Sequence, residues 1–220
     1  MKLAVFDCDG TLLDSHHSIV NAMNDTFAHH SLAPVPAAEI RSIIGLPLEV
    51  GIARLLEEDP RDAHHEFAAT YRRVFRGMRD AGEVSEPMFG GTREAIEILD
   101  EAGWLMGIAT GKARRGVDAA LGPLQLLKHF MTIQTADVAK GKPHPDMLDR
   151  AMAETGVDRR RTAMIGDTTF DMEMARNAGV AGIGVAWGYH PPAALHAAGA
   201  HVVIDDWRDL QTALDAVLGG

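Results

Sequence analysis

Two aspartates directly follow a short apolar run near the start of the chain. Residues 3–6 are all apolar, Asp7 and Asp9 come next, and Gly10 and Thr11 follow them. In extended backbone, residues two apart point the same way and lie about 6 to 7 Å apart, so both carboxylates can face one small volume. Unit charges about 4 Å apart repel by roughly 4 kcal/mol at an effective dielectric near 20, so a bound cation or a raised pKa must relieve them. The alternative is an ordinary polar exit from a strand, because Asp, Gly and Thr all favour turns.

A second apolar run ends in a hydroxyl. Thr110 follows the run at 104–109, and Gly111 comes next, at the mouth of an expected helix. Free backbone N–H groups at the start of a helix favour a bound phosphate, so Thr110 and Gly111 are candidate phosphate-binding residues. The alternative is that Thr110 simply caps the helix.

A lysine-containing loop with two prolines precedes another expected helix. The prolines at 143 and 145 fix the backbone and limit how far Lys142 can move. Lys142 is therefore a candidate point charge for an anionic substrate, with Lys140 as its rival. A solvated loop lysine is the alternative.

The fourth pattern is an apolar run that leads into two acids spaced four apart at a helix start. Gly166 and Asp167 end this run, and Asp171 lies in the first turn that follows. Carboxylate oxygens are ligands for a hard divalent cation such as Mg²⁺. An acid at a helix start is also an ordinary partner of the helix dipole, but that role does not explain the pairing with Asp7.

The elements that must position these residues alternate between strand and helix after Phe89. The apolar and helical patterns predict strands at 104–109, 131–134, 161–165 and 180–185, helices at 91–102, 113–121, 145–155 and 169–178, and a final strand–helix pair. Repeated βα units predict an α/β, Rossmann-like parallel sheet covered by helices on both faces. In such sheets the ligand site lies beyond the carboxyl ends of the strands, where all four polar patterns fall.

The segment between the first strand and Phe89 reads as helical throughout. Ser15 is placed to cap a helix with Ile19, Met23 and Phe27 on one face. Further helices are expected at 37–44, 48–58 and 61–80, broken by Pro34, Pro36, Gly45, Pro47 and Asp59-Pro60. No strand is expected between residues 14 and 86. The chain is therefore predicted to fold as a core domain of residues 1–13 and 88–220 with an inserted all-helical domain at 14–87.

The composition restricts the class of partner. The chain has 220 residues, 46% of them hydrophobic, and a formal net charge of −10. Nucleic acids and anionic membranes are bound through clustered Lys and Arg, which argues against both as partners. An anionic substrate therefore needs a local positive site, supplied by a divalent cation and one lysine. Cys8 is the one cysteine, and no signal-peptide pattern or membrane-spanning run is evident, so a cytoplasmic protein is expected. The expected assembly is a monomer or a homodimer.

Taken together, the four patterns resemble the motifs of the haloacid dehalogenase superfamily. Residues 7–11 match its D-x-D-G-T motif, Thr110 its phosphate-binding motif, Lys142 its lysine in a K-P-x-P setting, and residues 166–171 its G-D-x-x-x-D motif. The resemblance spans nearly the whole chain. It implies aspartyl-phosphate chemistry, in which Asp7 attacks phosphorus and Asp9 serves first as an acid and then as a base.

The resemblance also implies a set of binding residues. Mg²⁺ would be bound by Asp7, Asp167 and the backbone carbonyl of Asp9, while Asp171 would act either on the metal directly or from outside its ligand shell. Thr110, Gly111 and Lys142 would bind the substrate phosphate.

The helical insert resembles the C1 cap of the same superfamily, which would close over the site and control specificity. Residues 41–47 resemble the cap segment that dips toward the substrate, so Arg41, Ile44, Gly45 and Leu46 are specificity candidates. The alternative is a plain turn between helices. A loop at 187–190 is a further candidate for the rim of the site.

The resemblance indicates phosphate-ester chemistry. Asp9 argues against dehalogenases and phosphonatases, which lack an acid at that position. The motifs look most like those of phosphoglycolate phosphatases, so we expect a Mg²⁺-dependent phosphatase for a small phosphorylated metabolite, with 2-phosphoglycolate as the leading substrate. A β-phosphoglucomutase-like phosphotransferase and an inorganic pyrophosphatase are the enzymatic alternatives. A catalytically inactive regulatory or binding protein of the same fold is the alternative from another class.

Overall fold

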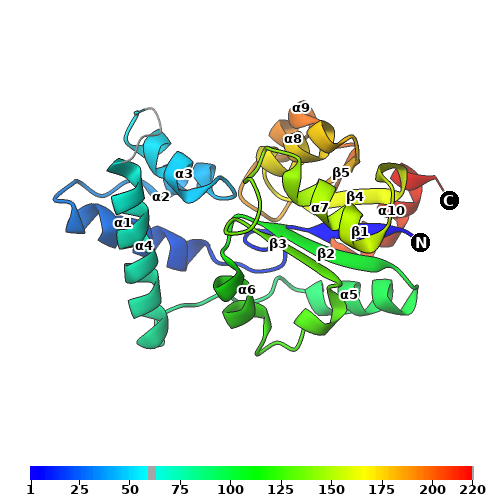
Figure 1. The fold of residues 1–220 in the computed structure, drawn as a ribbon, viewed down its shortest axis with the longest axis horizontal. Helices are drawn as coiled ribbons and strands as arrows, with labels where there is room; N and C mark the ends of the chain where they lie inside the picture. The colour runs from blue at the N-terminus through cyan, green and yellow to red at the C-terminus, as the bar shows by residue number, and fades with distance from the viewer. Residues whose placement is uncertain (59–62, 220) are drawn as a thin grey trace.

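Strands from both halves of the chain pair into one parallel sheet in the computed structural model, which describes residues 1–58 and 63–219 (Figure 1). Within the described residues the sheet has six strands in the order β3-β2-β1-β4-β5-β6. Their bounds are β1 Leu3–Phe6, β2 Leu105–Thr110, β3 Thr132–Thr135, β4 Thr162–Gly166, β5 Ala181–Val185 and β6 Val202–Ile204. All of the strand pairs are parallel, as the βα rhythm of the sequence predicts.

The first strand lies in the middle of the sheet, between β2 and β4, where the order of the strands reverses. Val5 of β1 aligns with Gly107 on one side and with Met164 on the other. The carboxyl ends of three neighbouring strands therefore lie side by side. In doubly wound sheets this reversal point opens a crevice where ligands bind.

Helices cover both faces of the sheet, as predicted (Figure 1). One face is covered by α7 (Asp146–Thr155) and α8 (Thr169–Ala178), with α9 (Pro192–Ala198) packed against α8. The other is covered by α5 (Thr92–Glu101), α6 (Arg114–Leu121) and α10 (Leu210–Leu218). Short 3-10 turns lie at Leu127–His129, Arg159–Arg161 and Trp207–Asp209.

Burial on both faces explains why β1 is apolar without alternation. Phe6 packs on one face, with ring centroids 6.2 Å from those of both Phe130 and Trp207. Leu3 and Val5 pack into the core on the opposite face. The strand is thereby held from both sides, and its carboxyl end is a rigid support for the residues that follow.

Four helices form the insert between β1 and α5 in the described residues: α1 (His16–His29), α2 (Ala37–Ile43), α3 (Leu48–Leu55) and α4 (Ala63–Asp80). Their apolar faces meet in a core that includes Met23, Phe27 and Ile52, and Phe170 of α8 packs into the same core. The described residues between 14 and 86 contain no strand, as expected. The α/β class with a helical cap is confirmed.

Two chain segments connect the insert to the sheet domain, and they lie side by side. Leu13 and Met88 form an isolated antiparallel bridge, and Asp14 N donates to Pro87 O over 2.8 Å. We propose that these connecting segments mark the boundary between a core domain of residues 1–13 and 88–220 and a cap of residues 14–87.

Most predicted elements after Phe89 have bounds within one residue of those observed, but some predictions were wrong. The helix expected at 48–58 ends at Leu55, because Glu57 adopts a left-handed backbone with φ 54°. Ser15 occupies the cap position of α1, but its side chain makes no capping hydrogen bond. Helix α9 was not expected. The predicted break at Asp59-Pro60 and the first two residues of the helix expected at 61–80 lie outside the described residues.

Membrane-spanning length is not reached by any apolar helix within the described ranges.

Candidate active site

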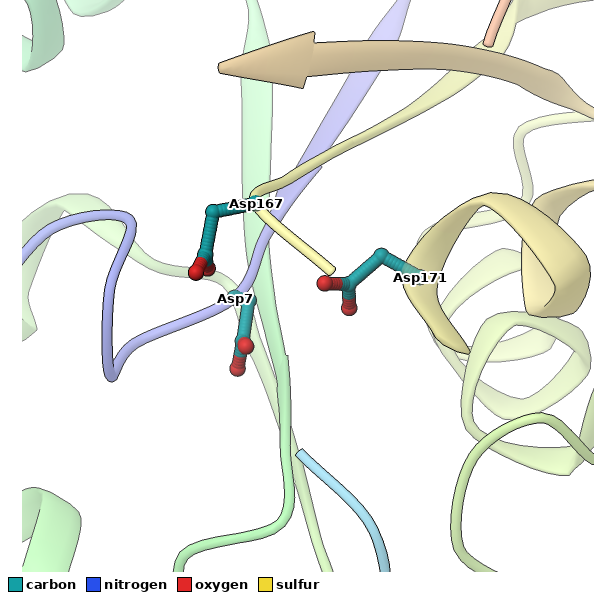
Figure 2. Close-up of side chains that lie close together, drawn as sticks. All are labelled: Asp7, Asp167 and Asp171. Carbon is teal, nitrogen blue, oxygen red and sulfur yellow. The ribbon is translucent and has the colours of Figure 1, made fainter. Parts of the chain in front are cut away.

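Three carboxylates from two strand ends and one helix converge at the reversal point of the sheet. Asp7 follows β1 directly, Asp167 follows β4 directly, and Asp171 lies in the first turn of α8. One oxygen from each lies within 4.8 Å of the others, and Figure 2 shows the three side chains turned toward a common space. Each residue is at most 1% exposed. The structure thus brings Asp7 next to two acids that lie more than 150 positions away in the sequence.

Lys142 is buried among these acids. Its Nζ lies 2.8 Å from Asp7 Oδ1 and 2.6 Å from Asp171 Oδ1, and its side chain is fully buried. Lys140, the rival, is exposed, and its backbone N–H donates to Asp146. The geometry therefore favours Lys142 as the lysine of the site.

Burial makes this group of charges costly. It raises the pKa of Asp7 to about 7, although the Lys142 ammonium acts in the opposite direction. Burial also raises the pKa of Asp167 well above its ordinary value, and the neighbouring Asp7 and Asp171 add to that effect. For Lys142, burial would lower the pKa, but Asp171 and Asp7 raise it above the ordinary value. The site holds more negative than positive charge and would be stabilised by a divalent cation.

The hydrogen bonds of the carboxylates indicate which oxygens are available to a metal. Asp7 Oδ1 accepts from Cys8 N over 2.6 Å and pairs with Lys142, whereas no group in the described residues donates to the buried Asp7 Oδ2. Asp171 Oδ2 accepts from both the N–H and the hydroxyl of Thr168 in a capping box, and Asp171 Oδ1 pairs with Lys142. Asp7 thus offers an oxygen with no partner among the described residues, whereas Asp171 Oδ2 accepts two hydrogen bonds and Asp171 Oδ1 is paired with Lys142.

Asp167 is oriented by two segments that approach it closely. Its Oδ1 accepts from the Thr11 hydroxyl over 2.8 Å, and its Oδ2 accepts from Tyr189 N over 2.9 Å. A Cβ at Gly10, where φ is +86°, or at Gly188 would overlap the Asp167 side chain. Each oxygen accepts one hydrogen bond and keeps a lone pair, so Asp7 and Asp167 together fit the oxygen donor set of a hard divalent cation.

The loop at 187–190 therefore helps to hold the site in place through hydrogen bonds. Trp187 Nε1 donates to Thr11 O over 3.1 Å, and the backbone N–H of Tyr189 holds Asp167. The sequence offered this loop only as a candidate for the rim of the site, and its contact with Asp167 was not predicted. The glycine in the middle of the loop was the available signal.

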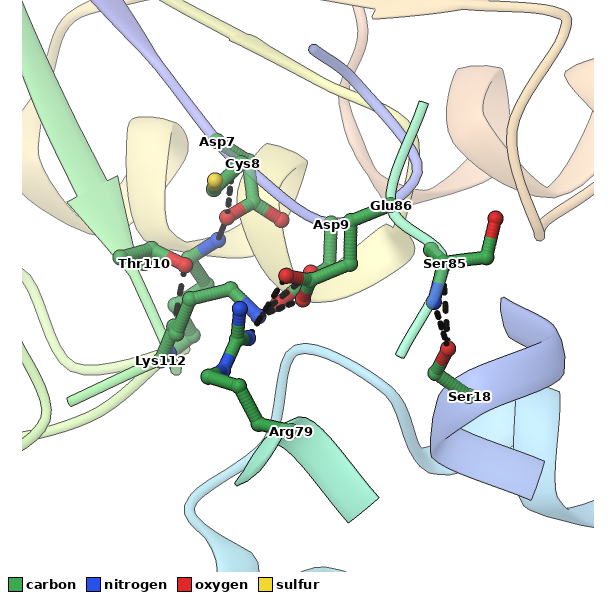
Figure 3. A network of polar contacts seen from close by, with 10 residues as sticks. Asp7, Cys8, Asp9, Ser18, Arg79, Ser85, Glu86, Thr110 and Lys112 are labelled. Atoms are coloured by element: carbon green, nitrogen blue, oxygen red, sulfur yellow. Dashed lines mark hydrogen bonds and ion pairs between the residues drawn. The ribbon is translucent and has the colours of Figure 1, made fainter. Parts of the chain in front are cut away.

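Asp9 belongs to a second polar network, which lies next to the three buried aspartates (Figure 3). Lys112 Nζ lies 3.0 Å from Asp9 Oδ1 and 2.9 Å from Glu86 Oε1. Arg79 of α4 lies 2.7 Å from the other oxygen of Glu86. Glu86 thus links the cap helix α4 to the core. Sequence reasoning missed Glu86 and Arg79. The position of Lys112 next to Gly111 was the one signal for this polar network.

Thr110 ends β2 and lines the same cavity as Asp7 and Asp9. Its hydroxyl accepts from Lys112 N over 3.2 Å. The cap residue of α6 is Ala113, so the alternative in which Thr110 caps this helix is wrong. Gly111 lies close to the cap, because a Cβ there would be 3.2 Å from Gly45 O.

A cavity of about 600 Å³ opens between the helical insert and the sheet domain. Ile44, Gly45 and Leu46 line it together with Asp7 and other core residues. Arg41 does not belong to its wall. The predicted cap segment thus reaches the cavity through its last residues.

The chain is similar to proteins named as phosphatases over almost its full length. It is 36% identical to "Probable phosphatase IndB" of Dickeya dadantii, covering 98% of this chain and 94% of that protein. It is 33% identical to a phosphoglycolate phosphatase of Agrobacterium fabrum, covering 96% and 91% of the two chains. A crystal structure of a hydrolase from Pseudomonas syringae matches with a TM-score of 0.84 at 27% identity, covering 99% of each chain.

Residues 4–185 match the family model described as haloacid dehalogenase-like hydrolase. This span contains the three acids, Lys142 and the whole helical insert. The chain belongs to the haloacid dehalogenase-like hydrolases.

Proposed function

We propose that this chain is a Mg²⁺-dependent phosphatase that hydrolyses a small organic phosphate through a phosphoaspartate on Asp7. The observation that supports this proposal best is the environment of Asp7. This residue is buried, is paired with Lys142, and has an oxygen without a hydrogen-bond donor among the described residues. It also lines the cavity together with Thr110 and Asp9. A nucleophile needs this combination of a positioned anion, a counter-charge and access to the substrate.

Asp7 and Asp167 would hold Mg²⁺, and the backbone carbonyl of Asp9 is the proposed third protein ligand. When bound, the ion would neutralise charge on the phosphoryl oxygens and help to orient the ester. We assign Asp171 to positioning Lys142 rather than to the metal, because its Oδ1 lies 2.6 Å from Lys142 Nζ and its Oδ2 accepts two hydrogen bonds from Thr168.

In the first step, a bond would form from Asp7 to phosphorus while the bond from phosphorus to the ester oxygen breaks. Lys142, Thr110 and the backbone N–H of Gly111 would hold the phosphoryl oxygens, as the charge-stabilising groups of phosphoryl transfer do. Asp9, protonated beforehand, would give its proton to the leaving oxygen and release an alcohol.

In the second step, the ionised Asp9 would take a proton from water, whose oxygen bonds to phosphorus as the bond to Asp7 breaks. This step releases inorganic phosphate and regenerates both aspartates. The cap would exclude bulk water during transfer. Ile44, Gly45 and Leu46 are proposed to contact the leaving group, and Arg41 is the remaining specificity candidate.

Relatives named as phosphatases support this activity, and the phosphoglycolate phosphatase among them supports 2-phosphoglycolate as the reference substrate. We propose a cytoplasmic enzyme, monomeric or homodimeric, whose partner is a small phosphorylated metabolite.

The test is phosphate release with Mg²⁺ from a panel of esters that includes 2-phosphoglycolate, sugar phosphates, nucleoside monophosphates and pyrophosphate. We expect Asp7→Asn to abolish turnover, while Asp25→Asn, on the exposed surface of α1, keeps it. Conversion of glucose 1-phosphate to glucose 6-phosphate without phosphate release would instead identify a mutase, and release from pyrophosphate alone a pyrophosphatase. If no ester reacts, the fold serves a binding or regulatory role.

A further inference from the structure

The cavity wall contributed by the cap is largely apolar and includes an aromatic pair. Tyr71 and Phe75 of α4 both line the cavity. They are four residues apart and share one helix face, with ring centroids 5.8 Å apart and an interplanar angle of 37°. Ile44 and Leu46 add aliphatic surface. A cavity of about 600 Å³ is within the size range of pockets that hold drug-sized ligands, much larger than glycolate requires.

The aromatic pair lies close to the proposed acid. Lys112 Nζ is 3.0 Å from Asp9 Oδ1 and 5.7 Å from the centre of the Phe75 ring. Arg79 approaches the same ring, with its Cζ 5.5 Å from the centre. Phe75 is thus held by two cations, one side chain away from Asp9. The group attached to the oxygen that Asp9 protonates would therefore lie near Phe75.

The cations in this wall are mostly committed to other partners. Lys112 pairs with Asp9 and Glu86, Arg79 pairs with Glu86, and Arg72 lies 2.8 Å from Glu49. Arg76 and Arg115, which also line the cavity, are exposed. A short leaving group with a carboxylate, such as glycolate, therefore meets no uncommitted buried cation among the described lining residues.

We infer that the cavity selects phosphate monoesters whose leaving group carries a flat apolar ring, aromatic or heteroaromatic, packed against Tyr71 and Phe75. This inference rests on the proposed function and makes 2-phosphoglycolate the poorer substrate. Ring packing on an aromatic wall adds to the free energy of burying the apolar surface itself.

The test compares two esters that differ in the ring and little else. 2-Phenylethyl phosphate and ethyl phosphate both release a primary alcohol, so their intrinsic reactivities are similar. With Mg²⁺ present, we expect kcat/KM for 2-phenylethyl phosphate to exceed that for ethyl phosphate by roughly tenfold or more, and 2-phosphoglycolate to fall with ethyl phosphate.

The variant Phe75→Leu tests whether the preference for the ring-containing ester depends on the ring of Phe75. Leucine keeps an apolar side chain but removes the flat ring, so the ratio of the two kcat/KM values is expected to fall toward one. Phe75 also contacts Lys112 and Arg79, so the substitution can lower the turnover of both esters equally. Such a general loss leaves the ratio of the kcat/KM values unchanged, whereas loss of the ring preference lowers it. Phe67→Leu is the matched control: Phe67 lies on the same helix and packs on Phe27 and His30, outside the cavity wall, so the wild-type ratio is expected.

Binding of the non-hydrolysable 2-phenylethylphosphonate and ethylphosphonate, measured by calorimetry, separates this inference from the proposed function. Tighter binding of the phenylethyl compound in a protein that hydrolyses no ester would overturn the function but leave the cavity preference standing. Hydrolysis of both esters with equal kcat/KM, or a ratio unchanged in Phe75→Leu, would overturn the preference and leave the function standing.

Discussion

At the scale of single residues, the site depends on balancing buried charges. Three carboxylates lie close together, one ammonium group pairs with two of them, and none of these side chains is exposed to more than a trace of solvent. Removing one partner of a buried ion pair leaves an uncompensated charge, which costs far more than the pair contributes on balance. The two lysines of one loop offer a direct comparison of a buried and an exposed cation.

Lys142→Met is expected to lower the free energy of unfolding by about 3 to 5 kcal/mol in the absence of metal, because Asp7 and Asp171 lose their counter-charge. Thermal unfolding would record this loss, and phosphate release is expected to fall by roughly a hundredfold or more. Lys140→Met, at an exposed position, should change neither measurement. The opposite result, in which Lys140→Met removes activity and Lys142→Met does not, would reassign the lysine.

Asp171→Asn tests whether this carboxylate binds the metal or positions Lys142. The amide oxygen can still accept from Thr168, so the capping of α8 is kept while the charge facing Lys142 is lost. We expect turnover to fall about 10- to 100-fold while the apparent Kd for Mg²⁺ stays within about threefold. A Mg²⁺ titration of activity is the measurement, and a Kd raised by more than about 100-fold, beyond the effect of losing a contact outside the ligand set, would make Asp171 a direct ligand.

At the scale of elements, the site is assembled from strand ends and the loops that support them. Gly188→Ala is expected to displace the loop at 187–190, because the new Cβ would overlap Asp167. Loss of the Tyr189 N–H donor should then weaken Mg²⁺ binding by about 10- to 100-fold. Gly90→Ala is the control, since a Cβ there meets no atom within 4 Å. Equal Mg²⁺ affinity in both variants and the wild type would show that the loop is dispensable.

The elements of the sheet domain could be predicted because their apolar periodicities are strong and their ends are marked by Gly, Pro and polar residues. The gathering of Asp7, Thr110 and Asp167 followed from one rule, that parallel strands end at the same edge. The contact of Glu86 with Lys112 could not be predicted, because it joins segments 26 residues apart through side-chain directions that no periodicity encodes. The end of α3 was also missed, because the left-handed turn at Glu57 has no glycine to mark it.

At the scale of the whole molecule, the cavity depends on how the cap meets the core. Gly111 of the core lies against the carbonyl of Gly45, and Glu86 joins Arg79 of α4 to Lys112. The cap thus contacts the same loop that carries the proposed phosphate-binding residues. In the proposed mechanism, substrate selection and phosphoryl transfer would therefore be coupled through a few side chains at the domain junction.

The charge of the site should make the stability of the whole protein depend on both pH and metal. Burial raises the pKa of Asp7 from 3.8 to about 7, so in the metal-free protein its contribution is fully present below pH 3.8 and is lost as the pH rises through about 7. Asp167 acts in the same direction, since its pKa is also raised. Metal-free protein should therefore lose stability from these groups as the pH increases across this range.

Mg²⁺ at the proposed site would bind the ionised carboxylates, so its stabilising effect should grow over the same pH range. At pH 8, Mg²⁺ at about 100 times its Kd would add roughly 2.7 kcal/mol, which corresponds to a rise in Tm of about 5 to 10 °C for a protein of this size. At pH 5 the rise should be much smaller, because protons compete with the metal for Asp7. Thermal unfolding with and without Mg²⁺ at both pH values is the measurement. Asp7→Asn should abolish most of the pH-dependent difference, and a Mg²⁺ effect that is equal at the two pH values in the wild type would contradict the proposed metal site.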